Sequence, residues 1–99
     1  MSEDTEQMLQ DRKLNAPRLN PQHIDDTITK AEFHRLTDTL TVCVLTLVNG
    51  FTVTGESACA SPENYNEEIG NKIARENARE KIWQLEGYLL KQQLYLASK

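Results

Sequence analysis

The chain lacks the sequence features of most enzymes and membrane proteins. No apolar run approaches the roughly 20 residues needed to span a bilayer, and the polar, acidic N-terminus shows no signal-peptide pattern. There is no CxxC, no HExxH and no Cys/His cluster at zinc spacing. We therefore expect a cytoplasmic protein with no membrane association, no bound metal and no other cofactor.

Basic side chains are also scarce. The 99 residues include 11 Lys and Arg against 15 Asp and Glu, for a net charge of −4. A general nucleic-acid binder normally has a basic surplus, so this class is not expected, although a local basic patch is compatible with the charge. The length is that of one domain.

Cysteine is limited to Cys43 and Cys59, which suits a reducing compartment. The hairpin described below places them on opposite faces, so two buried free thiols are expected rather than a disulfide. Catalysis would need one of them beside His23 or His34. No nucleophile motif surrounds either cysteine, and we expect that the protein is not an enzyme.

What the sequence does contain is a β-hairpin signal over residues 39–56. Asn49-Gly50 between two β-rich runs is typical of a two-residue type I′ turn. That turn would place Val48 opposite Phe51. The first strand is apolar on both faces and the second on one, which predicts an inner strand followed by a strand nearer an edge.

This register also predicts the hairpin's apolar face. A charge introduced there, as in Val44→Asp, is expected to unfold the protein. The apolar side chains on this predicted face are those of Val42, Val44, Val48, Phe51 and Val53.

The segments before the hairpin are less regular. Residues 1–19 are polar and acidic and predict a flexible arm, or one that orders against a partner, leaving residues 20–99 as a single domain. Asn20 followed by Pro21 predicts a short helix to about Thr29. Residues 31–36 fit either a first strand or a continuation of that helix, and we favour the strand.

A long helix is predicted from Asn66 to about Ala97. One apolar row would cover the sheet, and a second row on another face would need a different cover. The helix would be roughly 48 Å long, so it either breaks at a glycine or packs against a second subunit. The sheet-covering row is Ala74, Ala78, Ile82 and Leu85, and the row predicted to join a homodimer is Trp83, Gly87, Leu90 and Leu94.

Two smaller surface features are candidate contact sites. Lys72, Arg75 and Arg79 share one helix face and could contact phosphate, although neighbouring glutamates favour a solvated, salt-bridged face. Asn64 and Tyr65 lie in a turn entering a helix N-terminus, which could serve for recognition or simply link two elements.

The hairpin run TLTVCVLTLVNGFTVTGESAC is followed by PENYN, EIG and W-x-L-E-G-Y, ending at Tyr88. In this ordered combination, over about Ile24 to Leu94, the chain resembles a family of small uncharacterised proteins of tailed bacteriophages and prophages. The resemblance implies a phage or prophage product working in the bacterial cytoplasm. It implies no activity.

Together these patterns predict an α+β fold: a short helix, a two- or three-stranded antiparallel meander and a long C-terminal helix packed on the sheet. They predict a non-enzymatic phage protein that binds a host or phage protein as an oligomer. The alternative is a small nucleic-acid-associated protein using the helical basic stripe.

Overall fold

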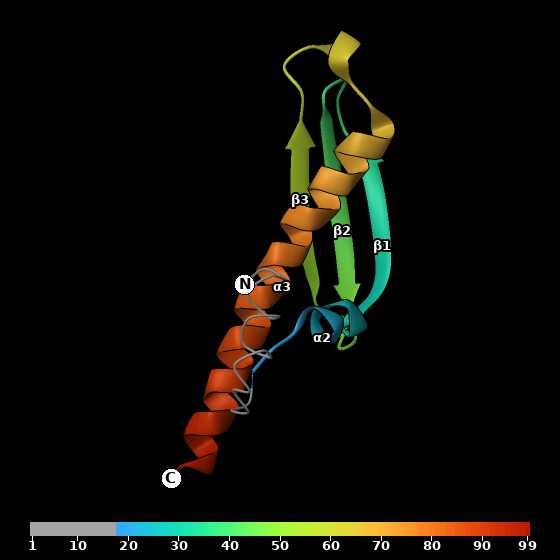
Figure 1. Cartoon of the computed structure of the whole chain (residues 1–99). Helices are drawn as coiled ribbons and strands as arrows, with labels where there is room; N and C mark the ends of the chain where they lie inside the picture. The colour runs from blue at the N-terminus through green and yellow to red at the C-terminus, as the bar shows by residue number, and fades with distance from the viewer. Residues whose placement is uncertain (1–17) are drawn as a thin grey trace.

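The structure, a computed structural model, describes residues 18–99. A long helix crosses one face of a three-stranded antiparallel sheet (Figure 1). The predicted α+β order is confirmed, whereas the arm predicted over residues 1–19 falls almost wholly outside the described residues. The elements are α2 (Pro21–Asp26), β1 (Ile28–Arg35), β2 (Leu40–Leu47), β3 (Thr52–Ala58), the 3-10 helix η1 (Pro62–Asn64) and α3 (Glu67–Ala97).

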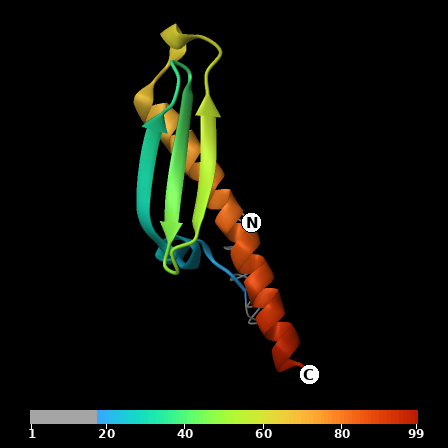
Figure 2. The same ribbon diagram turned by 180° about the vertical axis from the view of Figure 1, so that it is seen from behind.

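The sheet is a simple meander in the order β1-β2-β3. The ambiguous stretch at residues 31–36 belongs largely to β1, which pairs Phe33 with Cys43 of β2. The first hairpin strand is therefore the central one, and the second is an edge strand, as its one-sided apolar pattern predicted. Seen from behind, the sheet has no helix over its second face (Figure 2).

The hairpin is present, but the predicted two-residue turn is wrong. Its loop has three residues, 48–50, with Gly50 at φ +89°. The Gly50 amide donates to the Leu47 carbonyl at 2.9 Å, and the Leu47 amide donates to the Phe51 carbonyl at 2.8 Å. This is the three-residue hairpin in which a left-handed residue forms a bulge.

The extra loop residue shifts β3 by one position against β2. Val53 lies opposite Leu45 instead of Thr46. Because side chains alternate along a strand, a one-residue shift moves each of them to the other face. Leu45 is fully buried beneath α3, while Val44 is only half-buried on the open face. The predicted apolar face is therefore wrong for β2, whereas Val53 of β3 is buried as predicted. The expected unfolding by Val44→Asp no longer rests on a fully buried side chain.

The short helix α2 starts as predicted and ends early. The Asn20 side chain accepts a hydrogen bond from the His23 amide at 2.8 Å, as an N-cap does. The helix ends at Asp26, because the Thr27 hydroxyl bonds back to the Ile24 carbonyl at 2.7 Å and the next residue enters β1. Ile24 is fully buried in the core.

Close packing of α3 on the sheet depends on small residues. Ala74 and Ala78 are fully buried against Gly55 of β3, where a Cβ would overlap the Ala78 nitrogen and the Ala74 oxygen. Ile82 continues this contact and is also fully buried. Leu85 was predicted to do the same but is 42% exposed, because α3 runs diagonally and leaves the sheet near this point (Figure 1).

Helix α3 is continuous through Gly87, so the glycine does not break it. Its 31 residues correspond to about 46 Å at 1.5 Å per residue. The radius of gyration is 16.4 Å, against about 13 Å for a compact domain of 100 residues. The C-terminal part of the helix extends beyond the sheet and α2 (Figures 1 and 2).

The Gly55 contact predicts a strong effect of a single methyl group. Gly55→Ala should lower the free energy of unfolding by about 3 kcal/mol, since the new Cβ would push α3 off the sheet. Gly87→Ala is the matched control: a Cβ there meets nothing within 4 Å, so stability should rise by about 1 kcal/mol. Urea denaturation followed by circular dichroism measures both. A wild-type curve for Gly55→Ala would contradict this packing.

The observed register predicts which of two neighbouring residues matters. Leu45→Ala should cost about 2–5 kcal/mol, as expected for a large buried aliphatic side chain. Val44→Ala should cost less than half as much, because its side chain is only half-buried on the open face. Urea denaturation again measures the free energy of unfolding of both variants. A larger loss of stability for Val44→Ala than for Leu45→Ala would favour the two-residue turn.

Candidate functional site

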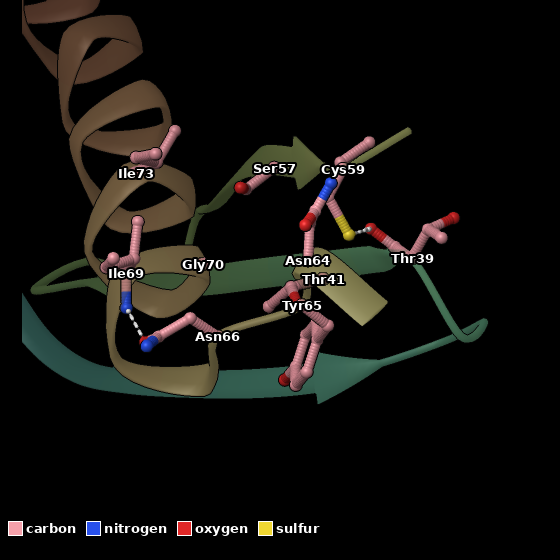
Figure 3. A pocket seen from close by; sticks show the side chains of 11 residues that line it. Thr39, Thr41, Ser57, Cys59, Asn64, Tyr65, Asn66, Ile69, Gly70 and Ile73 are labelled. Carbon is pink, nitrogen blue, oxygen red and sulfur yellow. Dashed lines mark hydrogen bonds between the residues drawn. The ribbon is translucent and has the colours of Figure 1, made fainter. Parts of the chain in front are cut away.

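A pocket lies at the end of the sheet where β2 begins, β3 ends and α3 starts (Figure 3). Its volume is about 130 Å³, which is room for several water molecules. The wall combines hydroxyl, carboxamide and aliphatic side chains and contains no charged side chain. Its residues are Thr39, Thr41, Ser57, Ala58, Cys59, Asn64, Tyr65, Asn66, Ile69, Gly70 and Ile73.

The chain between β3 and α3 forms one side of this pocket. Pro62 begins η1, and the Tyr65 amide bonds to its carbonyl at 3.1 Å. Asn66 then caps α3, its side-chain oxygen accepting from the Ile69 amide at 2.9 Å (Figure 3). The predicted recognition turn, Asn64 and Tyr65, therefore lies in the pocket wall.

Tyr65 is held in place from outside the pocket. The guanidinium carbon of Arg35, at the end of β1, lies 3.7 Å from the centre of the tyrosine ring. A cation over an aromatic face is attracted by the ring's negative potential. The pair joins the end of β1 to the segment that leads into α3.

Thr41 supplies the unusual polar group of the pocket. The residue is 2% exposed, and its Oγ1 has no hydrogen-bond partner within residues 18–99. An unsatisfied buried hydroxyl costs about 1–3 kcal/mol. The helix residue above it is Gly70, where a Cβ would lie 3.5 Å from Thr41 Oγ1. The hydroxyl is therefore buried beneath the first turns of α3, at a point where the helix carries no side chain.

The two cysteines are both free, as expected, and differ in environment. Cys43 is buried in the core, and that burial raises the pKa of its thiol above the ordinary value. Cys59 is half-buried in the pocket wall, where its Sγ lies 3.8 Å from the Thr39 carbonyl oxygen.

Two other properties can be stated for residues 18–99. They bring together no group of three or more His, Cys, Asp or Glu side chains suited to holding a metal ion. In the same part of the chain, no helix combines the length and apolar character needed to cross a membrane.

The three residues of the predicted basic stripe have different environments in the structure. Arg79 is used internally: its Nε donates to an Asp25 carboxylate oxygen at 2.8 Å and its Nη2 to the Pro21 carbonyl at 3.2 Å. These bonds fasten α2 to α3. Lys72 is exposed and Arg75 half-buried, so a contact with phosphate would depend chiefly on these two.

The row predicted to join two subunits is buried at its start and partly exposed farther along. Trp83 is only 8% exposed and belongs to the core cluster that includes Ile24 of α2. Around Trp83, the second face of α3 is thus covered by α2. The sequence pattern predicted the sheet, and beyond it a second subunit, as covers for α3, but not α2. Farther along, Leu90 is half-buried and Leu94 is 41% exposed.

Among the described residues, a further exposed apolar surface lies on the other row of the same helix. Leu85, Leu89 and Leu96 share one face and are 42%, 48% and 57% exposed. This surface reaches the hairpin loop, because Phe51 lines an open hollow together with Leu85 and Leu89. We call these four residues the distal patch. The sequence pattern had assigned Leu85 of this patch to the sheet.

Comparison with known proteins agrees with the resemblance noted in the sequence. Residues 19–94 match the model of the Phage protein (N4 Gp49/phage Sf6 gene 66) family. No curated protein and no solved structure matches the chain. The matched range begins just before α2 and includes the whole sheet, the pocket and most of α3. Because the match covers well over half of its length, the chain belongs to the Phage protein (N4 Gp49/phage Sf6 gene 66) family.

Proposed function

We propose that this phage protein acts without catalysis, by binding a host or phage protein in the bacterial cytoplasm as a homodimer. The observation that carries the proposal is the exposed apolar surface on the overhanging end of α3. Six large apolar side chains between positions 85 and 96 are at least 41% exposed. Extended apolar surface on a protein of this size usually marks an interface.

The distal patch is proposed as the dimer interface. Its three leucines recur at steps of four and seven, so they form a straight seam along the overhanging helix. A second copy could bring the same seam alongside it in a two-fold arrangement, which is the commonest symmetry of soluble oligomers. Leu94, from the row first expected to join subunits, lies on the opposite side of this helix.

Two tyrosines beside the seam are proposed to contact the partner protein. Tyr88 is 74% exposed and Tyr95 is 50% exposed, and both lie on the same flank of α3. Tyrosine is enriched where binding energy concentrates in protein interfaces. The acidic segment from Ser2 to Lys13, outside the described residues, is a further candidate contact that could order on binding.

The rival function, association with nucleic acid, has less support. Its basic stripe contributes Lys72 and Arg75, while Arg79 is already paired with Asp25. The net charge is −4, which opposes general attraction to phosphate.

The oligomeric state provides a direct test. The wild-type chain should have a dimer mass by light scattering at micromolar concentration, and Leu89→Asp with Leu96→Asp should yield a folded monomer. Leu36→Asp is the matched control, since Leu36 is 62% exposed and lies in the turn at the other end of the sheet. A monomeric wild type, or a dimer unaffected by the paired change, would contradict the proposed interface.

A second experiment tests the partner. Tagged protein is recovered from nuclease-treated lysate of phage-infected bacteria, and bound proteins are quantified by mass spectrometry. A stoichiometric protein should accompany the wild type and be lost from Tyr88→Ala with Tyr95→Ala, a variant that should remain dimeric. Equal recovery with the variant would exclude the tyrosine surface. Recovery of nucleic acid alone, lost at high salt, would favour the rival function.

A further inference from the structure

We propose that the pocket at the start of α3 binds a small uncharged molecule that carries both a hydrogen-bond donor and an acceptor, as a carboxamide does. The anchor is Thr41 Oγ1, which is buried and has no partner within the described residues. A hydroxyl can donate and accept at once, so it suits a ligand group with both functions. This inference is independent of the proposed dimer, whose interface lies near the opposite end of α3.

The chemistry of the wall selects an uncharged ligand. The lining residues include no Asp, Glu, Lys, Arg or His, so neither a cation nor an anion finds a counter-charge among them. Glu67 and Glu68 in the first turn of α3 would further oppose an anion at this helix start. Ser57 and Asn64 add a hydroxyl and a carboxamide beside Thr41 (Figure 3).

The size and the apolar part of the wall limit the ligand further. A volume of about 130 Å³ suits a polar head with a short aliphatic stem. Ile69 and Ile73 provide the apolar side for such a stem, in the manner typical of small-molecule sites. Gly70 leaves the hydroxyl without a side chain over it, since a methyl group in its place would sit in van der Waals contact with Thr41 Oγ1.

Three probes of similar shape test the proposal: propionamide, propionate and propylammonium. Each is titrated at constant ionic strength into the full chain labelled with ¹⁵N, and backbone amide shifts are followed by NMR. Propionamide should give saturable shifts at Thr41, Ser57 and Gly70. The two charged probes should bind at least tenfold more weakly.

Two variants locate the site. Thr41→Val removes the hydroxyl with little change in shape, and Gly70→Ala fills the space above it without a clash. Each should weaken propionamide binding at least tenfold while leaving the amide spectrum dispersed. Thr54→Val, on the exposed face of β3, should bind as the wild type does. The proposal is overturned if propionamide gives no saturable shifts, if the charged probes bind equally well, or if both pocket variants retain wild-type binding.

Discussion

The close approach of α3 to Gly55 is the contact on which the rest of the structure depends. Two alanines of the helix, Ala74 and Ala78, lie directly on the glycine, with no space for a further methyl group. This contact places the helix over β2 and β3. The strand β1 pairs with β2, and its other contacts are with α2 and through the Arg35–Tyr65 pair. A larger residue at position 55 would change the position of every element above the sheet.

This placement gives one helix two separate surfaces. At its start, α3 lies over Thr41 and closes the pocket with Gly70, a second point at which a missing side chain matters. Beyond Ile82 the diagonal path carries the helix off the sheet and exposes the distal patch. The two surfaces lie near opposite ends of a molecule whose longest dimension is 54 Å, so each can be altered without disturbing the other.

Much of the fold could be predicted because it follows from local rules. Asn20 and Asn66 each cap a helix with a side-chain oxygen, and the unbroken helical pattern continues past Gly87. The turn type was harder, since Asn-Gly fits both a two-residue turn and a three-residue loop with glycine in the left-handed position. That single ambiguity exchanged the buried and open faces of β2 relative to the prediction.

The sequence by itself determined the two helices, the hairpin between them, their order and the family, while it left the first strand open. Only the tertiary structure decided which apolar side chains are covered, because coverage depends on the angle between α3 and the sheet and on where α2 packs. Trp83 and Leu85 sit two positions apart in one helix, yet α2 helps to bury the first and the second is left exposed. No local sequence pattern marks Thr41. Its hydroxyl is unusual only because α3 packs over β2 with Gly70 above it.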